Sequence, residues 1–235
     1  MRPVHAEEVR LARALTQKTL KFALPSPMTI VETVSDKYYR DESKLAFAFA
    51  RAINEEAREL AALGVDVIQL DEPAFNIHLD KVRDWGVAAL EEAIRGVPCK
   101  TAIHICYGYG LPANIAWKQG LGPEWRQYEV TFPLLAKTAI DQVSLEAINS
   151  RVPLSLLSAL RGKQMAVGAI DIATERVETS EQVSSVLRQA LEYVPAERLP
   201  ASTNCGMALL PRQVAAQKMR ALVQGTSALR KELHH

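Results

Sequence analysis

Short apolar runs alternate with longer amphipathic stretches along most of the chain. The apolar runs predict buried strands at residues 20–24, 65–70, 101–106, 142–147, 165–172 and 199–203. The amphipathic stretches predict helices at residues 6–15, 43–63, 80–94, 153–161, 180–193 and 211–231. Residues 107–137 carry scattered prolines and glycines, so we expect a long loop there with one or two short helices.

These elements make six units of a strand followed by a helix, the pattern of parallel strands with crossover helices. Such units build either an open doubly wound sheet or a (β/α)₈ barrel, which takes about 250 residues. Polar residues that could act as ligands or catalytic groups lie near the ends of the predicted strands: Asp71, His104, Cys106, Glu146, Asp171 and Cys205. An open sheet would spread them along one edge, whereas a barrel gathers them around one mouth. The sequence therefore favours an α/β fold of the TIM-type (β/α)₈ barrel, with about six of its units visible.

Composition and charge narrow the class of protein. The 235 residues are 48% hydrophobic, enough for one sizeable domain over residues 1–233, and His234 and His235 resemble the remnant of a purification tag. The formal net charge of +1 favours neither nucleic acid nor an anionic membrane as a partner. No apolar run reaches the roughly 20 residues of a membrane span. Three cysteines argue against a disulfide framework, so we expect a reducing, cytoplasmic location.

A metal site is the main chemical prediction. His104 and Cys106 lie two residues apart, on the same face if they belong to a strand, and their side chains are common zinc ligands. One such pair cannot complete a tetrahedral site, but Glu146 and Cys205 stand at the ends of two other predicted strands. Each is weak evidence alone, because a lone cysteine is more often a small buried apolar residue. Taken jointly, the four residues predict bound Zn²⁺.

Other polar residues near the strand ends have two readings. Asp71 and Glu72 precede Pro73 and form either an ordinary turn that ends a strand or an acidic pair that holds a substrate ammonium group. Tyr107 and Asn204 either line the site or make local hydrogen bonds in their loops. Cys99 precedes a strand and is expected to be a bystander.

Four sequence segments together resemble a known family. They read IQLDEPA at residues 68–74, HICY at 104–107, SLEAINSR at 144–151 and NCGM at 204–207. Their order and spacing resemble the C-terminal catalytic barrel of cobalamin-independent methionine synthase, over about residues 20–229. The resemblance implies that His104, Cys106, Glu146 and Cys205 bind zinc and take part in catalysis. It also implies that Asp71 holds the amino group of homocysteine, with Glu72, Tyr107 and Asn204 as further substrate-binding residues.

The chain departs from the family pattern in two ways. The long N-terminal domain of the large enzymes has no counterpart, so the chain resembles a short, barrel-only branch. Family barrels also begin with two further strand units, and neither precedes Leu20. An open barrel would expose sheet edges, so we expect either self-association near residues 20–24 or a completing segment outside these residues. Asn204 stands where the family has aspartate.

The expected function follows from the zinc site and the resemblance. Zinc coordination deprotonates a thiol, and the thiolate is the reactive nucleophile. We expect a methyltransferase that converts homocysteine to methionine with a methyl-folate as donor. Two alternatives stay open. One is methyl transfer from a methyl-corrinoid to a thiol, and the other is a catalytically incomplete zinc-binding barrel that acts with a partner.

Overall fold

A computed structural model describes residues 4–110 and 112–233 of the chain. The chain divides into two compact units. Unit 1 comprises Met1–Ile105 and Pro133–Val143, and unit 2 comprises Cys106–Phe132 and Ser144–His235. The predicted tag remnant, His234 and His235, lies outside the described residues, and the assignment of residues 1–233 to one domain stays a prediction.

The strands follow one another through the sheet in sequence order. In the described residues they are β1 (Lys21–Pro25), β2 (Val67–Asp71), β3 (Lys100–His104), β4 (Gln142–Glu146), β5 (Gln164–Gly168) and β6 (Ala201–Ser202). The pairs β1–β2, β2–β3, β3–β4 and β5–β6 are parallel. Parallel strands in sequence order require crossovers of one hand, so this topology confirms the α/β class and is consistent with part of a TIM-type barrel.

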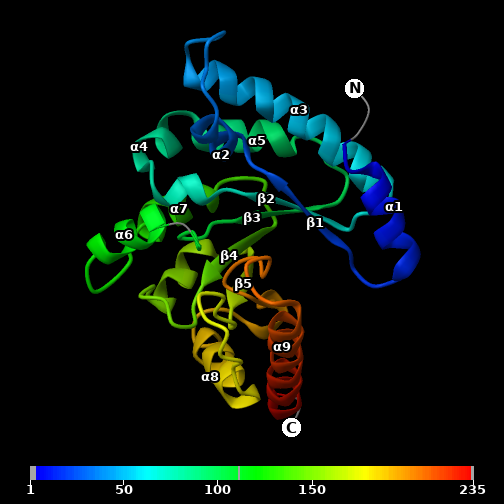
Figure 1. The fold of residues 1–235 in the computed structure, drawn as a ribbon, viewed down its shortest axis with the longest axis vertical. Coiled ribbons are helices and arrows are strands. Elements are labelled where there is room, and N and C mark those ends of the chain that lie inside the picture. The colour runs from blue at the N-terminus through cyan, green and yellow to red at the C-terminus, as the bar shows by residue number, and fades with distance from the viewer. Residues whose placement is uncertain (1–3, 111, 234–235) are drawn as a thin grey trace. The chain divides into compact units, whose positions relative to one another are not determined.

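Unit 1 covers β1 to β3 with helices. These are α1 (Ala6–Leu15), α2 (Pro27–Thr33), α3 (Glu42–Ala62), η1 (Pro73–Asn76), α4 (Leu79–Lys81), the π-helical η2 (Val82–Gly86) and α5 (Val87–Ile94). Figure 1 shows α2, α3 and α5 side by side on one face of these strands. Helix α3 turns Leu45, Ala46, Ala50 and Ile53 into the core, as its apolar spacing predicts. Helix α2 was not predicted, because Pro25 and Pro27 indicate a break, yet Pro27 suits the first turn of a helix.

Unit 2 carries the second set of helices. They are α6 (Pro112–Gly120), the first part of α7 (Tyr128–Leu135), η3 (Leu154–Leu160), α8 (Ser180–Ala190), η4 (Ala196–Arg198) and α9 (Arg212–Leu233). Thr179 and Gln182 form a capping box that starts α8. Helix α9 runs along α8 (Figure 1), and Gly225 permits their close approach, since an added Cβ would meet the Ser180 carbonyl oxygen at 2.6 Å.

Four predicted elements need correction. The helix predicted at residues 80–94 is divided into α4, the π-helical η2 and α5. The strand predicted at residues 101–106 ends at His104, so Cys106 lies beyond the sheet. The strand predicted at 165–172 ends at Gly168, which leaves Asp171 in the following loop. The helix predicted at 153–161 is 3₁₀ rather than α.

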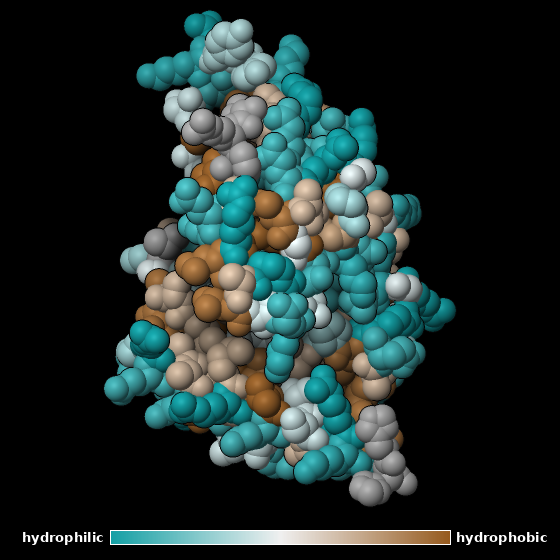
Figure 2. All heavy atoms as spheres, turned by 90° about the vertical axis from the view of Figure 1, so that its right-hand side faces the viewer, coloured by the Kyte–Doolittle hydropathy of each residue, from teal (hydrophilic) through white to brown (hydrophobic). Residues whose placement is uncertain are grey.

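The surface carries both hydrophobic and hydrophilic residues. Figure 2 shows one face of the protein on which hydrophobic residues lie among hydrophilic ones. Among residues 4–110 and 112–233, no helix combines the length and the apolar character that crossing a bilayer requires.

Candidate metal and active site

The end of β3 positions the first two candidate ligands. His104 is the last residue of β3, and its carbonyl oxygen accepts a hydrogen bond from the Glu72 main-chain N–H at 2.8 Å. Cys106 follows two residues later, and both side chains are buried. The strand pleat therefore does not place Cys106, although chain connectivity keeps it close to His104.

The thiols of Cys106 and Cys205 lie close together in unit 2. The ligand atoms of Cys106 and Cys205 lie within 4.8 Å of one another. The pKa of the Cys106 thiol is raised well above its usual range, first by its hydrogen bond with Cys205 and then by burial. These two cysteines offer the sulfur ligands of a metal site, His104 precedes Cys106 by two residues in the sequence, and Glu146 is not among the close ligand atoms. A nitrogen and two sulfurs suit zinc far better than Ca²⁺ or Mg²⁺, which prefer oxygen ligands.

Glu146 ends β4 and is only 1% exposed. Its Oε1 accepts a hydrogen bond from the Tyr107 main-chain N–H at 2.8 Å, and its Oε2 accepts one from the Tyr109 hydroxyl at 2.6 Å. Burial raises the pKa of this carboxyl to about 7, although the bonds from Tyr109 and Tyr107 act in the opposite direction. The segment that follows Cys106 therefore holds the Glu146 side chain.

Asn204 fixes the chain next to Cys205. Its main-chain N–H donates to the Ile170 carbonyl oxygen at 2.9 Å. Its side-chain Nδ2 donates to the Ile148 carbonyl oxygen at 2.8 Å, while Oδ1 accepts from the Ala147 N–H at 3.2 Å. These contacts favour the local hydrogen-bonding reading, in which Asn204 positions Cys205.

The acidic pair of unit 1 divides into two roles. The buried Glu72 carboxylate accepts the Met28 N–H at 3.1 Å and the Thr29 hydroxyl at 2.5 Å, so it anchors the start of α2. Burial raises its pKa to about 7. Asp71 ends β2, is half-buried, and accepts a hydrogen bond from Gln69 Nε2 at 2.8 Å. Of the two side chains, Asp71 is the more exposed.

An aromatic cluster packs around Tyr107, the residue that follows Cys106. The Tyr107 ring packs against Trp117, Trp125 and Tyr128 with centroid distances of 5.7, 4.7 and 5.2 Å. Its hydroxyl donates to Gln127 Oε1 at 3.1 Å. Burial raises the pKa of Tyr107, and the nearby Glu146 adds to that shift. Tyr107 thus contributes both a main-chain donor to Glu146 and a wall of the cluster.

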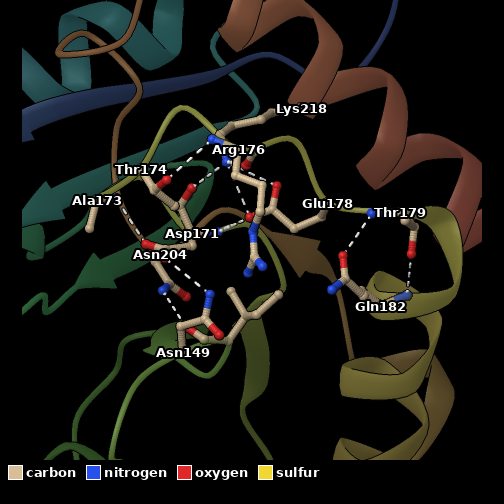
Figure 3. Close-up of polar contacts among 11 residues, drawn as sticks. Asn149, Asp171, Ala173, Thr174, Arg176, Glu178, Thr179, Gln182, Asn204 and Lys218 are labelled. Carbon is tan, nitrogen blue, oxygen red and sulfur yellow. Dashed lines mark hydrogen bonds and ion pairs between the residues drawn. The ribbon is translucent and has the colours of Figure 1, made fainter.

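Sequence reasoning missed Lys218, which is fully buried in unit 2. Its ammonium group pairs with Glu178 at 3.0 Å and donates to the carbonyl oxygens of Asp171 at 2.8 Å and Arg176 at 2.5 Å (Figure 3). The Asp171 side chain in turn accepts hydrogen bonds from Asn149 Nδ2 at 3.1 Å and from the Ala173 N–H at 2.8 Å. Helix α9 therefore holds the loop after β5. A lysine within an amphipathic helix gives no sequence signal of burial.

Tyr109 was also missed, although the repeated Tyr-Gly pattern of residues 107–110 singles out a constrained loop. Its hydroxyl contacts Glu146, and burial, followed by the Glu146 charge, raises its pKa.

A parallel sheet with two close cysteines in the loops that follow its strands defines an α/β protein with a thiol-rich candidate metal site. The sequence model of one family, described as "Cobalamin-independent synthase, Catalytic domain", matches residues 1–228. The chain belongs to this family, which confirms the resemblance found in the sequence.

Individual relatives agree with that assignment. The chain is 37% identical to a methionine synthase of Saccharolobus islandicus over 91% of its length, and 34% identical to that of Saccharolobus solfataricus over 98%. It spans 59% and 65% of those relatives' own lengths.

Solved structures show the same fold. A B12-independent methionine synthase from Shewanella sp. W3-18-1, solved in complex with selenomethionine, is 52% identical with a TM-score of 0.96. It covers 99% of this chain, which covers 68% of it. A putative enzyme of the same description from Listeria monocytogenes shares the fold at 21% identity and a TM-score of 0.71 over 97% of this chain and 70% of its own.

Proposed function

We propose that this protein transfers a methyl group from a methyl-folate to the thiol of homocysteine, which yields methionine. The observation that carries the proposal is the pair of close thiols in unit 2, the buried Cys106 and the half-buried Cys205, in a chain of this family. The related Shewanella enzyme was solved with selenomethionine, an analogue of the proposed product.

Zinc is the metal that these residues suit, and His104, Cys106 and Cys205 would hold it. Glu146 is the proposed fourth ligand. When bound, the metal would lower the pKa of a coordinated substrate thiol so that it reacts as a thiolate near neutral pH. The burial of Cys106 and Glu146 keeps water from the reacting sulfur.

The remaining residues orient the substrate in this proposal. Asp71 binds the ammonium group of homocysteine through a charge-assisted hydrogen bond. Tyr107 forms an aromatic wall, and Asn204 holds Cys205 in place. Glu72 stabilises the start of α2, which lies beside the Asp71 strand end, because the Asp71 carbonyl oxygen accepts the Ser26 N–H at 3.1 Å. The partners are small molecules, and we propose a cytoplasmic location.

The decisive experiment combines metal analysis with a donor assay. Protein purified without chelator should contain about one zinc per chain and should form methionine from homocysteine and a methyl-folate. Methyl-cobalamin, assayed in parallel, tests the alternative donor. A zinc content near zero that zinc supplementation does not change would overturn the proposal, as would activity with methyl-cobalamin alone.

A further inference from the structure

Both oxygens of the Glu146 carboxylate are engaged by the segment that follows Cys106. The Tyr107 N–H and the Tyr109 hydroxyl supply the two bonds, at 2.8 and 2.6 Å. The first donor belongs to the main chain and the second to a side chain. In the same structure, Glu146 is not among the close metal-ligating atoms, which include those of Cys106 and Cys205. The segment after Cys106 therefore holds the Glu146 carboxylate, a position called docked below.

The position of Tyr109 is determined by its neighbours. Gly108 and Gly110 both have a φ of +76°, a conformation that favours glycine. A Cβ at Gly108 would lie 2.1 Å from Asn114 Nδ2, and one at Gly110 would lie 2.7 Å from a Leu209 methyl carbon. Both glycines thus allow the loop to pack closely on either side of Tyr109.

Lys118 also contacts the loop that carries Tyr109. Lys118 donates to the Gly108 carbonyl oxygen at 2.7 Å, and its ammonium nitrogen lies 4.3 Å from the centroid of the Tyr109 ring. This contact adds a cation–π attraction to the main-chain bond. The hydroxyl is therefore presented to Glu146 by a loop with little freedom.

A buried carboxylate needs a partner wherever it lies. Leaving it without hydrogen bonds or a counter-charge in an apolar site is costly. A glutamate that gives up its place on a metal to a substrate thiol can do so readily only if another donor receives it. Tyr109 is such a donor, because its bond to Glu146 uses an oxygen that could otherwise bind the metal.

We propose that Tyr109 is a positioning residue that competes with the metal for Glu146 and holds the carboxylate while a substrate thiol occupies its place. The inference rests on the proposed function, since it assumes a bound metal and a thiol substrate. With a metal bound, a thiolate sulfur would take the place of a carboxylate oxygen, and the thiol proton would pass to water.

The test is the zinc affinity of Tyr109→Phe, measured without substrate by competition with a chelator. Removing the hydroxyl weakens the docked position, so zinc should bind more tightly, by about tenfold for one hydrogen bond to a charged group. Homocysteine should bind the zinc-loaded variant more weakly by a similar factor. A residue that merely supported Glu146 on the metal would have the opposite effect, because losing such support typically weakens metal binding by about 10- to 100-fold.

Tyr107→Phe is the matched control for zinc affinity. It removes a hydroxyl from the same loop that contacts Gln127 rather than Glu146, so zinc affinity should stay at the wild-type value. Circular dichroism establishes that both variants fold. Unchanged or weaker zinc binding by folded Tyr109→Phe overturns the inference and leaves the proposed function intact, whereas wild-type protein without zinc affinity overturns the proposed function itself.

A second measurement needs no variant. Zinc should alter the tyrosine ultraviolet difference spectrum of the wild-type protein, as Glu146 leaves Tyr109, and homocysteine should reverse that change. Absence of the reversal in protein that binds both zinc and homocysteine would contradict the exchange.

Discussion

At the scale of single residues, the candidate site separates side chains that offer ligands from side chains that hold them. Cys106 and Cys205 offer sulfur atoms as ligands. Tyr107 instead donates its main-chain N–H to Glu146, and the Asn204 side chain donates to the Ile148 carbonyl oxygen. The residue types of the ligands could be predicted, since histidine, cysteine and glutamate at strand ends suit zinc. The supporting roles of Tyr109 and Lys218 could not, because a tyrosine or lysine becomes a support only through the packing of distant segments.

Replacement of one thiol should remove the metal and leave the fold. Cys205→Ser substitutes a poor zinc ligand, so the loss of zinc affinity should exceed the about 10- to 100-fold effect of an outer contact. Elemental analysis and circular dichroism check the two parts. The control is Cys99→Ser immediately before β3, where the sulfur donates to the Lys100 carbonyl oxygen at 3.5 Å, so zinc content should stay unchanged.

Asp71→Asn should weaken homocysteine binding without affecting zinc. The substitution keeps the shape of the side chain but removes the charge that would pair with the substrate ammonium, so the Michaelis constant for homocysteine should rise by about tenfold or more. Steady-state kinetics and elemental analysis measure this. If Asp71 serves only the turn before Pro73, the melting temperature will change and the Michaelis constant will not.

Glu72 should make stability depend on pH in an unusual direction. Its folded-state pKa is about 7, above the ordinary value of 4.5, so the native state holds the proton more strongly than the unfolded state. This contribution is fully present below pH 4.5 and is lost as the pH rises to about 7. Glu72→Gln removes the titration, and its free energy of unfolding relative to wild type should rise over that range by up to about 3 kcal/mol.

Urea unfolding of both proteins at several pH values provides the comparison. Because other carboxyl groups titrate equally in both proteins, the difference between them isolates Glu72. A difference that is constant from pH 4 to pH 8 would show that the pKa of Glu72 is the same in the native and unfolded states, so that burial does not raise it.

At the scale of elements, apolar periodicity predicted most strands and the long helices correctly. Helix 6–15 matches α1, and helix 43–63 is within one residue of α3. Errors gather where the chain leaves the sheet: residues after His104 and Gly168 are as apolar as the strands they follow, although the ladder has ended. Local sequence carries no signal for that difference, because burial by loops and burial by strands select the same residues.

The α8–α9 contact should be sensitive to one methyl group. In Gly225→Ala the new Cβ would lie 2.6 Å from both the Ser180 carbonyl oxygen and the Val183 Cβ, so the helices must move apart. Overpacking of this kind costs about 1–3 kcal/mol. Gly120→Ala at the end of α6 is the control, since nothing lies within 4 Å of the added methyl group and stability should change little. Thermal melts of both variants and of the wild-type protein measure these changes in stability.

At the scale of the whole molecule, metal binding and folding should be linked. A ligand that binds only the native state stabilises it, by about 2.7 kcal/mol at a free concentration of 100 times the dissociation constant. For a chain of this size that corresponds to an increase of about 5–11 °C in melting temperature. Zinc should produce this increase in wild-type protein and a chelator should reverse it, while Cys205→Ser should respond to neither. An equal response of that variant would place the bound zinc elsewhere.

The contact between Gly168 and Asn204 has a consequence for how the family diverges. A Cβ at position 168 would lie 2.4 Å from the Asn204 Oδ1 and 2.8 Å from its Cα, so no larger residue fits there while Asn204 keeps its bonds to Ala147 and Ile148. Substitution at either position alone displaces the chain that carries Cys205. Evolution should therefore change positions 168 and 204 together or not at all, and covariation among relatives would mark this pair although neither residue contributes a metal ligand.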